Sequence, residues 1–235
     1  VSIMHGNHEI GTLQDLKIIG TLCKKYKVIF HTDATQTFMK HDLHVAEDPV
    51  QLPDLITFSS HKLHGPKGVG ALYVRKSIQL QPIVRGGGQE LGLRSGTENV
   101  LGIMGFAAAV ELAEQADGED FQQMQELQTL LVKHLLRFSH VQLNGPKDLK
   151  KRLVNNVHVS ILGKEGDSVV LSLSKKDICI STGATCSTRD PRPSPILKAI
   201  QLNDKEIRGS LRISISRYTT QKDIEAFLKT LQSLL

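Results

Sequence analysis

The chain has 235 residues, of which 40% are hydrophobic, 23% charged and 4% aromatic. This length suits one large domain or about one and a half small ones, and the composition makes wholesale disorder unexpected. The net charge of +5 is spread along the chain and forms no basic patch with interleaved aromatics, so no nucleic-acid partner is expected.

The apolar runs and the cysteines bear on the cellular location of the protein. No run approaches the roughly 20 apolar residues of a transmembrane helix, so no membrane partner is expected. The chain has three cysteines and no Cys-x-x-Cys pair, which favours a reducing, cytoplasmic location over secretion and leaves a mitochondrial one open. It begins on an apolar stretch without an initiating methionine, as a chain cut from a longer one would.

The first hundred residues alternate β-rich runs with helical patterns. The apolar spacing of 12–26 predicts a helix, with Thr12 and Asp15 as a capping box. Because near-continuous apolar strands separated by helices form mostly parallel sheets, the pattern predicts an α/β fold whose ligands bind beyond the carboxyl ends of the strands. The β-rich runs predict four strands, at 1–4, 28–32, 55–58 and 69–74.

A second region follows, and we place the boundary between a large domain (1–115) and a smaller α+β domain (116–235) there. Thr97 is expected to cap a helix that ends near Glu114. A second capping box, Thr220 with Asp223, is expected to open the last helix. The spacing of apolar residues predicts helices at 120–138, 167–174, 193–200 and 220–235 and strands at 154–161, 178–181 and 211–216.

Two polar runs follow predicted strands, and each carries a residue suited to a carbonyl cofactor. Lys62 comes directly after strand 55–58, where its amine could form a Schiff base; an exposed loop lysine is the alternative. Asp33 ends strand 28–32, where a carboxylate could hold a protonated pyridine nitrogen. A turn or capping role suits Asp33 equally well.

The cysteines differ in their surroundings. Cys186 lies in a small, polar, proline-rich stretch with Arg189 and Arg192, which would favour its thiolate; an ordinary surface thiol is the alternative. Cys23, on the apolar face of a predicted helix, and Cys179, in a predicted strand, are expected to be unreactive core thiols.

The remaining ligand signals are weak. Gly86–Gly88, upstream of Thr97, could offer backbone amides to a phosphate, although tight turns often contain paired glycines. His61 and His64 lie three apart without a further ligand pair, so no metal site is expected.

Four motifs occur in a fixed order along the chain: His31-Thr32-Asp33-Ala34-Thr35-Gln36, Ser59-x-His61-Lys62, Gly86-Gly87-Gly88 through Arg94-Ser95-Gly96-Thr97, and Ser181-x-Gly183-x-x-Cys186. In order and spacing the chain resembles the cysteine desulfurases, pyridoxal-phosphate enzymes of the class V aminotransferase group that are related to selenocysteine lyases. The resemblance includes Asn7-x-Glu9-Ile10-Gly11 and Leu211-Arg212-Ile213-Ser214, and it corresponds to roughly the C-terminal two-thirds of the family chain.

The resemblance implies the fold type I of pyridoxal-phosphate transferases, with an N-terminally truncated large domain and a homodimer with shared sites. It implies that Lys62 binds the cofactor covalently and removes the substrate's Cα proton. Cys186 would accept the sulfur of L-cysteine as a persulfide, leaving L-alanine. Arg212 would grip the substrate carboxylate, and Asn7 would also bind substrate. The implied cofactor contacts are His8, Asp33, Gln36, Ser59, His61, Lys62 and Thr97, the last reaching the phosphate of the partner subunit.

The function implied is that of a cysteine desulfurase that supplies sulfur to an iron–sulfur scaffold or another acceptor protein. A selenocysteine lyase is one alternative, and a truncated, non-catalytic chain that dimerises or holds partners is another. His8 departs from the family pattern, because many members carry an asparagine there that contacts the cofactor ring oxygen.

Overall fold

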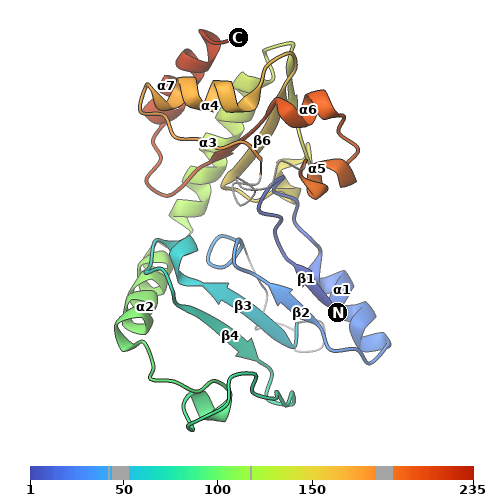
Figure 1. Ribbon diagram of the computed structural model, residues 1–235, viewed down its shortest axis with the longest axis vertical. Helices are drawn as coiled ribbons and strands as arrows, with labels where there is room; N and C mark the ends of the chain where they lie inside the picture. The colour runs from blue at the N-terminus through green and yellow to red at the C-terminus, as the bar shows by residue number, and fades with distance from the viewer. Residues whose placement is uncertain (42, 44–52, 117, 184–192) are drawn as a thin grey trace. The chain divides into compact units, whose positions relative to one another are not determined.

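The computed structural model describes residues 1–41, 43, 53–116, 118–183 and 193–235, which fall into two compact units (Figure 1). The first unit comprises Val1–His5 and Gln14–Asp117, and the second comprises Gly6–Leu13 and Gly118–Leu235. The chain therefore leaves the first unit after its first strand, contributes eight residues to the second, and returns.

A four-stranded sheet forms the framework of the first unit, and its strands follow one another in chain order (Figure 1). The first three strands are parallel, as predicted, and the fourth is antiparallel to the third. Asp33 pairs with Met4 on one side and Thr57 on the other, so the carboxyl ends of three strands meet at one edge. The strands are β1 (Ser2–Met4), β2 (His31–Asp33), β3 (Leu55–Ser59) and β4 (Gly70–Val74).

Helix α1 (Leu16–Lys25) begins later than its capping-box pattern predicted. Its N-cap is Asp15, whose Oδ1 accepts the Ile18 amide at 3.0 Å. Thr12, the expected start, pairs instead with Arg152 as a β-bridge. The expectation was wrong because a partner far along the chain holds the Thr12 backbone in an extended conformation.

Helix α2 (Val100–Gln115) is capped by Asn99, whose Oδ1 accepts the Gly102 amide at 3.0 Å. The expected cap, Thr97, lies in an exposed loop, and that prediction was wrong. Asparagine and threonine both cap helices well, so residue type alone could not separate them. Neither α2 nor any other helix in the described ranges is long and apolar enough to cross a membrane.

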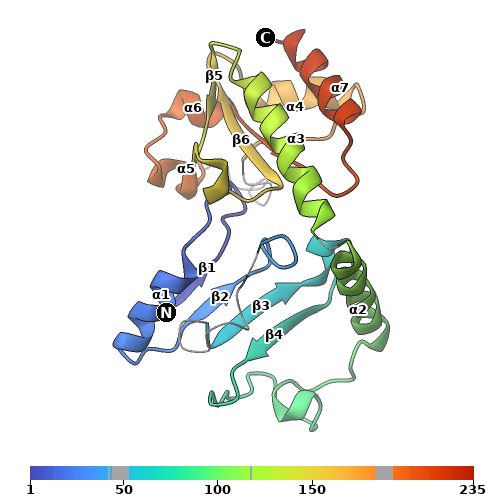
Figure 2. The ribbon, with the colours of Figure 1, turned by 180° about the vertical axis from the view of Figure 1, so that it is seen from behind.

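The second unit is built on a three-stranded antiparallel sheet whose middle strand is buried at every residue. Helices α3 and α7 lie side by side against it (Figure 2). The Thr220–Asp223 capping box is confirmed at the start of α7. The elements are β5 (Val141–Leu143), β6 (Asn156–Ile161), β7 (Ser210–Ser214), α3 (Glu119–Leu135), α4 (Gly166–Ser174), α5 (Pro195–Ala199), α6 (Asp204–Arg208) and α7 (Gln221–Gln232).

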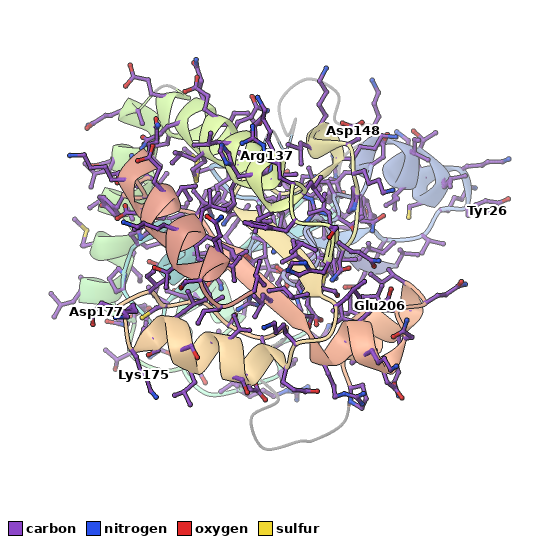
Figure 3. The ribbon with its side chains drawn as sticks, turned by 90° about the horizontal axis from the view of Figure 1, so that it is seen from above. Tyr26, Arg137, Asp148, Lys175, Asp177 and Glu206 are labelled. Atoms are coloured by element: carbon purple, nitrogen blue, oxygen red, sulfur yellow. The ribbon has the colours of Figure 1, made fainter. Side chains whose placement is uncertain are left out.

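The predicted strand 178–181 does not form. The chain leaves α4 through an exposed turn with Lys175 and Asp177 at the surface (Figure 3), and only Ser181 pairs with a strand, as a bridge to Arg212. Cys179 is therefore exposed, which corrects its expected core position, whereas Cys23 is buried as predicted.

Candidate functional site

Lys62 lies on a tight turn that follows β3 directly. The turn is a short 3-10 helix, η1 (Ser60–Leu63), and the Gly65 amide closes it on the Ser60 carbonyl at 3.2 Å. A Cβ atom at Gly65 would lie 2.2 Å from Ser60 Oγ and 3.2 Å from the Ala109 Cβ on α2, so any larger residue would force the Ser60 side chain to move. The turn is thus packed against α2, which fixes the backbone that carries Lys62.

Hydroxyl and imidazole groups flank the lysine. Ser59 Oγ and His61 Nδ1 lie 2.8 Å apart, and Lys62 and His61 are both exposed. The hydroxyl of Ser60 is buried and has no hydrogen-bond partner among the described residues. These groups form a polar end to β3, as the sequence predicted.

Asp33 occupies the corresponding end of the neighbouring strand. Its Oδ1 accepts the Thr35 amide at 2.8 Å, and the Ala34 amide donates to the Thr57 carbonyl at 3.0 Å. Because β2 and β3 are parallel neighbours, Asp33 and the Lys62 turn follow adjacent strand ends. Gln36 is half-buried in the turn after Asp33.

A second lysine supports the turn, and the sequence reasoning missed it. Lys40 Nζ donates to the Lys62 carbonyl oxygen at 2.9 Å. Burial, together with the charge of Lys62, lowers the pKa of Lys40 to about 8. The sequence places Lys40 four residues after Gln36, but the contact depends on the pairing of β2 with β3, which no local pattern reveals.

Two histidines also lie in this unit, His5 directly after β1 and His41 after the turn that follows β2. His5 Nδ1 lies 2.9 Å from Thr37 Oγ1, and the His5 amide donates to the Asp33 carbonyl at 2.9 Å. Burial lowers the pKa of His5 to about 4. The pKa of His41 also falls to about 4, because of burial first and then the charges of His5 and Lys40. Both imidazoles are therefore neutral at pH 7.

The glycine-rich loop of the first unit is exposed, and Thr97 with it. The Ser95 amide donates to the Val84 carbonyl at 3.3 Å, and the Gly96 amide donates to Gln89 Oε1 at 3.3 Å. Both hydrogen bonds join residues of this loop, and the Thr97 side chain lies at the surface.

The second unit carries the other predicted site residues that the structure describes. Asn7 Oδ1 accepts the amides of Glu9 and Ile10, each at 2.9 Å, which folds 6–13 into a turn. Arg212, on β7, donates from Nη1 to the His8 carbonyl at 3.3 Å. Asn7, His8 and Arg212 therefore belong to one cluster. Cys186, with Arg189 and Arg192, lies outside the described residues.

A fully buried arginine joins the segment 6–13 to the rest of the second unit. Arg152 donates to the carbonyls of Ile10 and Pro146, each at 2.9 Å, and to the carbonyl of Asn144. It also contacts Asn156 Oδ1 at 3.3 Å. Burial lowers the pKa of Arg152 to about 10, so the guanidinium stays charged at pH 7.

His158 lies beside Arg212 in the strand register and is also fully buried. Its Nδ1 lies 3.0 Å from Asn144 Nδ2, which makes Nδ1 the acceptor and Nε2 the protonated nitrogen. Burial, then the charges of Arg152 and Arg212, lower the pKa of His158 to about 3. The imidazole is therefore neutral at physiological pH.

The described residues contain no group of three or more His, Cys, Asp or Glu side chains placed to hold a metal ion. The first unit presents an amine, a carboxylate, a hydroxyl and an imidazole at the carboxyl ends of adjacent parallel strands. That donor set suits an aldehyde cofactor with a ring nitrogen and a phosphate.

Comparison with known proteins agrees with this arrangement. The aminotransferase class-V family model matches residues 1–227. The chain is 41% identical over 236 residues to the cysteine desulfurase IscS of Clostridium botulinum (strain Hall), covering 100% of this chain and 59% of that protein. It is 39% identical over 236 residues to the IscS of Dictyoglomus turgidum, with the same coverage. The chain thus spans about three fifths of the length of the curated relatives it matches.

Solved structures give the same result for the fold. A NifS-like protein from Rickettsia africae superposes with a TM-score of 0.87 at 33% identity, covering 100% of this chain and 61% of that one. SspA in complex with cysteine superposes with a TM-score of 0.67 at 32% identity, covering 93% of this chain and 59% of that one. These likenesses confirm the predicted α/β fold class.

Proposed function

The chain belongs to the aminotransferase class-V family, and from that premise we propose that it is the part of a pyridoxal-phosphate cysteine desulfurase that holds the cofactor lysine and the sulfur-accepting cysteine. The observation that carries the proposal is the placement of Asp33 at the end of β2 and of Lys62 directly after the parallel neighbour β3. The relatives named cysteine desulfurase support the choice of L-cysteine as substrate.

The residues of the first unit fit pyridoxal phosphate. Lys62 supplies the amine that binds its aldehyde, and Asp33 supplies a carboxylate for the ring nitrogen. Ser59 and His61, already within 2.8 Å of each other, supply hydrogen bonds to the phosphate, and Gln36 supplies one to the ring oxygen. The bound cofactor provides an electron-withdrawing ring that allows an amino acid to lose its α-proton.

Different side chains then act as the base and bind the substrate. The Lys62 amine takes the α-proton of the substrate and returns it, because an amine beside the reacting carbon is a suitable base. Arg212 binds the substrate carboxylate through its planar fork, with Asn7 beside it. His8 and Thr97 complete the cofactor contacts, Thr97 from a partner subunit.

Cys186 accepts the sulfur. Its thiolate attacks the sulfur of L-cysteine, the carbon–sulfur bond of the substrate breaks, and a sulfur–sulfur bond forms on Cys186. Cys186 and L-cysteine together hold every hydrogen found in the persulfide and L-alanine, so no external oxidant or reductant is required. The persulfide is then available to an acceptor protein such as an iron–sulfur scaffold.

Exposed apolar side chains support a homodimer. Ile83 and Leu91 are each 97% exposed and Leu101, on α2, is 87% exposed. Large apolar side chains left this exposed are typical of an interaction surface. Leu101→Asp should therefore shift the full-length protein towards monomer in sedimentation velocity. A dimer that is unchanged by this substitution would show that Leu101 lies outside the dimer interface.

Two variants test the activity in the full-length protein. Lys62→Ala should lose the visible absorption band that appears when pyridoxal phosphate is added, whereas Lys67→Ala, in the same loop, should keep it. Cys186→Ser should keep the band and lose sulfur release from L-cysteine, and unchanged release would exclude the persulfide role. Relative turnover of selenocysteine and cysteine separates the lyase alternative from the desulfurase.

A further inference from the structure

One face of the sheet in the second unit is polar, although it is buried. Three polar residues of β6, Asn156, His158 and Ser160, alternate with apolar residues that belong to the core of this unit. All three polar residues are buried. Burial of hydrogen-bonding groups costs free energy, so packing alone does not account for this face.

His158 and Arg212 are directly opposite each other on the neighbouring strands β6 and β7. The Arg212 amide donates to the Ser181 carbonyl at 2.7 Å and its carbonyl accepts the Ser181 amide at 3.2 Å, so both point to the other side of β7. Opposite residues whose backbone groups point apart form a non-hydrogen-bonded pair, in which the Cα atoms lie about 4.5 Å apart and the side chains are closest. The imidazole of His158 therefore lies against the side chain of Arg212. Nη1 of Arg212 donates to the His8 carbonyl at 3.3 Å, which fixes the far end of the same side chain.

Asn144 holds the imidazole ring in one orientation. Its backbone amide donates to the His158 carbonyl at 2.9 Å, and its Nδ2 donates to His158 Nδ1 at 3.0 Å and to Ser160 Oγ at 2.8 Å. Ser160 Oγ in turn donates to the Glu206 carbonyl on α6 at 2.8 Å. A continuous line of hydrogen bonds therefore runs from α6 to the ring beside Arg212.

The imidazole is a costly choice for a purely structural position. Nε2 of His158 is buried and has no hydrogen-bond partner among the described residues, a cost that an apolar side chain would avoid. Burial, then the charges of Arg152 and Arg212, lower the pKa of His158 to about 3. The ring is therefore uncharged at pH 7 and lies beside an arginine without repelling it.

We propose that His158 is a positioning residue for Arg212, a fixed ring against which the arginine side chain packs so that its guanidinium is held ready for the carboxylate of the substrate. The inference rests on the proposed function, which assigns that carboxylate to Arg212. Immobilising a side chain with as many rotamers as arginine costs free energy on binding, and holding it in place beforehand removes that cost. His158 thus raises the affinity for substrates that carry a carboxylate and takes no part in the sulfur transfer.

The test compares L-cysteine with cysteamine, which is L-cysteine without its carboxylate. The affinity of the full-length, cofactor-loaded protein for each is measured by the change in cofactor absorbance on titration. His158→Ala should weaken the binding of L-cysteine about five- to tenfold and that of cysteamine less than about twofold. In steady-state turnover of L-cysteine, KM should rise by a similar factor, whereas kcat should change by less than about twofold.

Three further variants separate positioning from general loss of stability. His158→Asn keeps an uncharged acceptor for Asn144 Nδ2 and should bind L-cysteine within about threefold of wild type. Asn144→Ala leaves His158 in place but removes the donor that holds its ring, so it should weaken L-cysteine binding selectively; it also serves if His158→Ala fails to fold. Val157→Ala, on the apolar face of β6, is the control and should lower Tm without changing either affinity.

Equal weakening of both ligands by His158→Ala, or unchanged L-cysteine affinity in both His158→Ala and Asn144→Ala, would overturn the positioning role. The same selective weakening in Val157→Ala would also overturn it. Arg212→Ala, measured in parallel, distinguishes this failure from failure of the proposed function. If Arg212→Ala keeps the preference for L-cysteine over cysteamine, the assignment of the carboxylate to Arg212 is wrong, and the role of His158 falls with it. If Arg212→Ala loses that preference and His158→Ala keeps it, only the role of His158 is wrong.

Discussion

Replacement of Arg152 by methionine tests whether one buried guanidinium holds three chain segments together. The arginine donates to the carbonyls of Ile10, Asn144 and Pro146 from a fully buried position. Methionine has a similar apolar stem but no donor, so Arg152→Met would leave these three buried carbonyls without that partner.

The expected loss follows from two opposing terms. Three carbonyls that lose a charged donor cost about 2 kcal/mol each, or about 6 kcal/mol together. Burial lowers the pKa of Arg152 from 12.5 to about 10, a penalty on the charge of about 3 kcal/mol that methionine would not incur. The net destabilisation is therefore about 3 kcal/mol.

Urea denaturation of the full-length protein at pH 7, followed by far-ultraviolet circular dichroism, measures this value. Lys151→Met is the matched control, because Lys151 is the exposed neighbour and its loss should change the free energy of unfolding by less than about 0.5 kcal/mol. A loss below about 1 kcal/mol for Arg152→Met would show that water or backbone shifts replace the arginine and would refute this account.

Three further predictions concern the turn of Lys62 and the buried histidine. Gly65→Ala places a Cβ atom 2.2 Å from Ser60 Oγ and should weaken pyridoxal-phosphate binding about tenfold in a fluorescence titration, whereas Gly88→Ala, with open space around it, should not. Lys40→Met removes the 2.9 Å contact to the Lys62 carbonyl and should raise the cofactor Kd severalfold, with Lys40→Arg close to wild type; equal affinities in all three proteins would exclude this support. His158 has its pKa lowered to about 3, so between pH 6.5 and 3 the unfolded chain binds more protons and stability falls as pH falls. His158→Gln should flatten the dependence of Tm on pH between 7 and 5, and an unchanged slope would place its origin in other groups.

Local patterns predicted the elements whose stabilising contacts are local. The capping box of Thr220 and Asp223 formed as expected because both partners lie within one helical turn. Thr12 and Asp15 match the same rule, yet Thr12 pairs with Arg152, which lies far along the chain. No local sequence pattern reveals that Arg152 pairs with the backbone of Thr12.

The candidate site shows the same division. The positions of Lys62 and Asp33 after strands could be predicted, because each directly follows an apolar run. Lys40 supports Lys62 only because two strands pair, and His158 lies opposite Arg212 only because two others do. Motifs identified the groups suited to the chemistry, whereas their supports depend on topology that the motifs do not encode.

The path of the chain through 6–13 bears on how the protein is made. Ile10 can reach its donor Arg152 only after 142 further positions have been synthesised. Contacts of such long range form late and slow folding. The second unit therefore cannot be completed from its own continuous stretch, 118–235, which lacks the segment 6–13 that Arg152 and Asn156 bind. Expressed alone, that stretch should expose the buried polar groups of Arg152 and Asn156 that segment 6–13 covers.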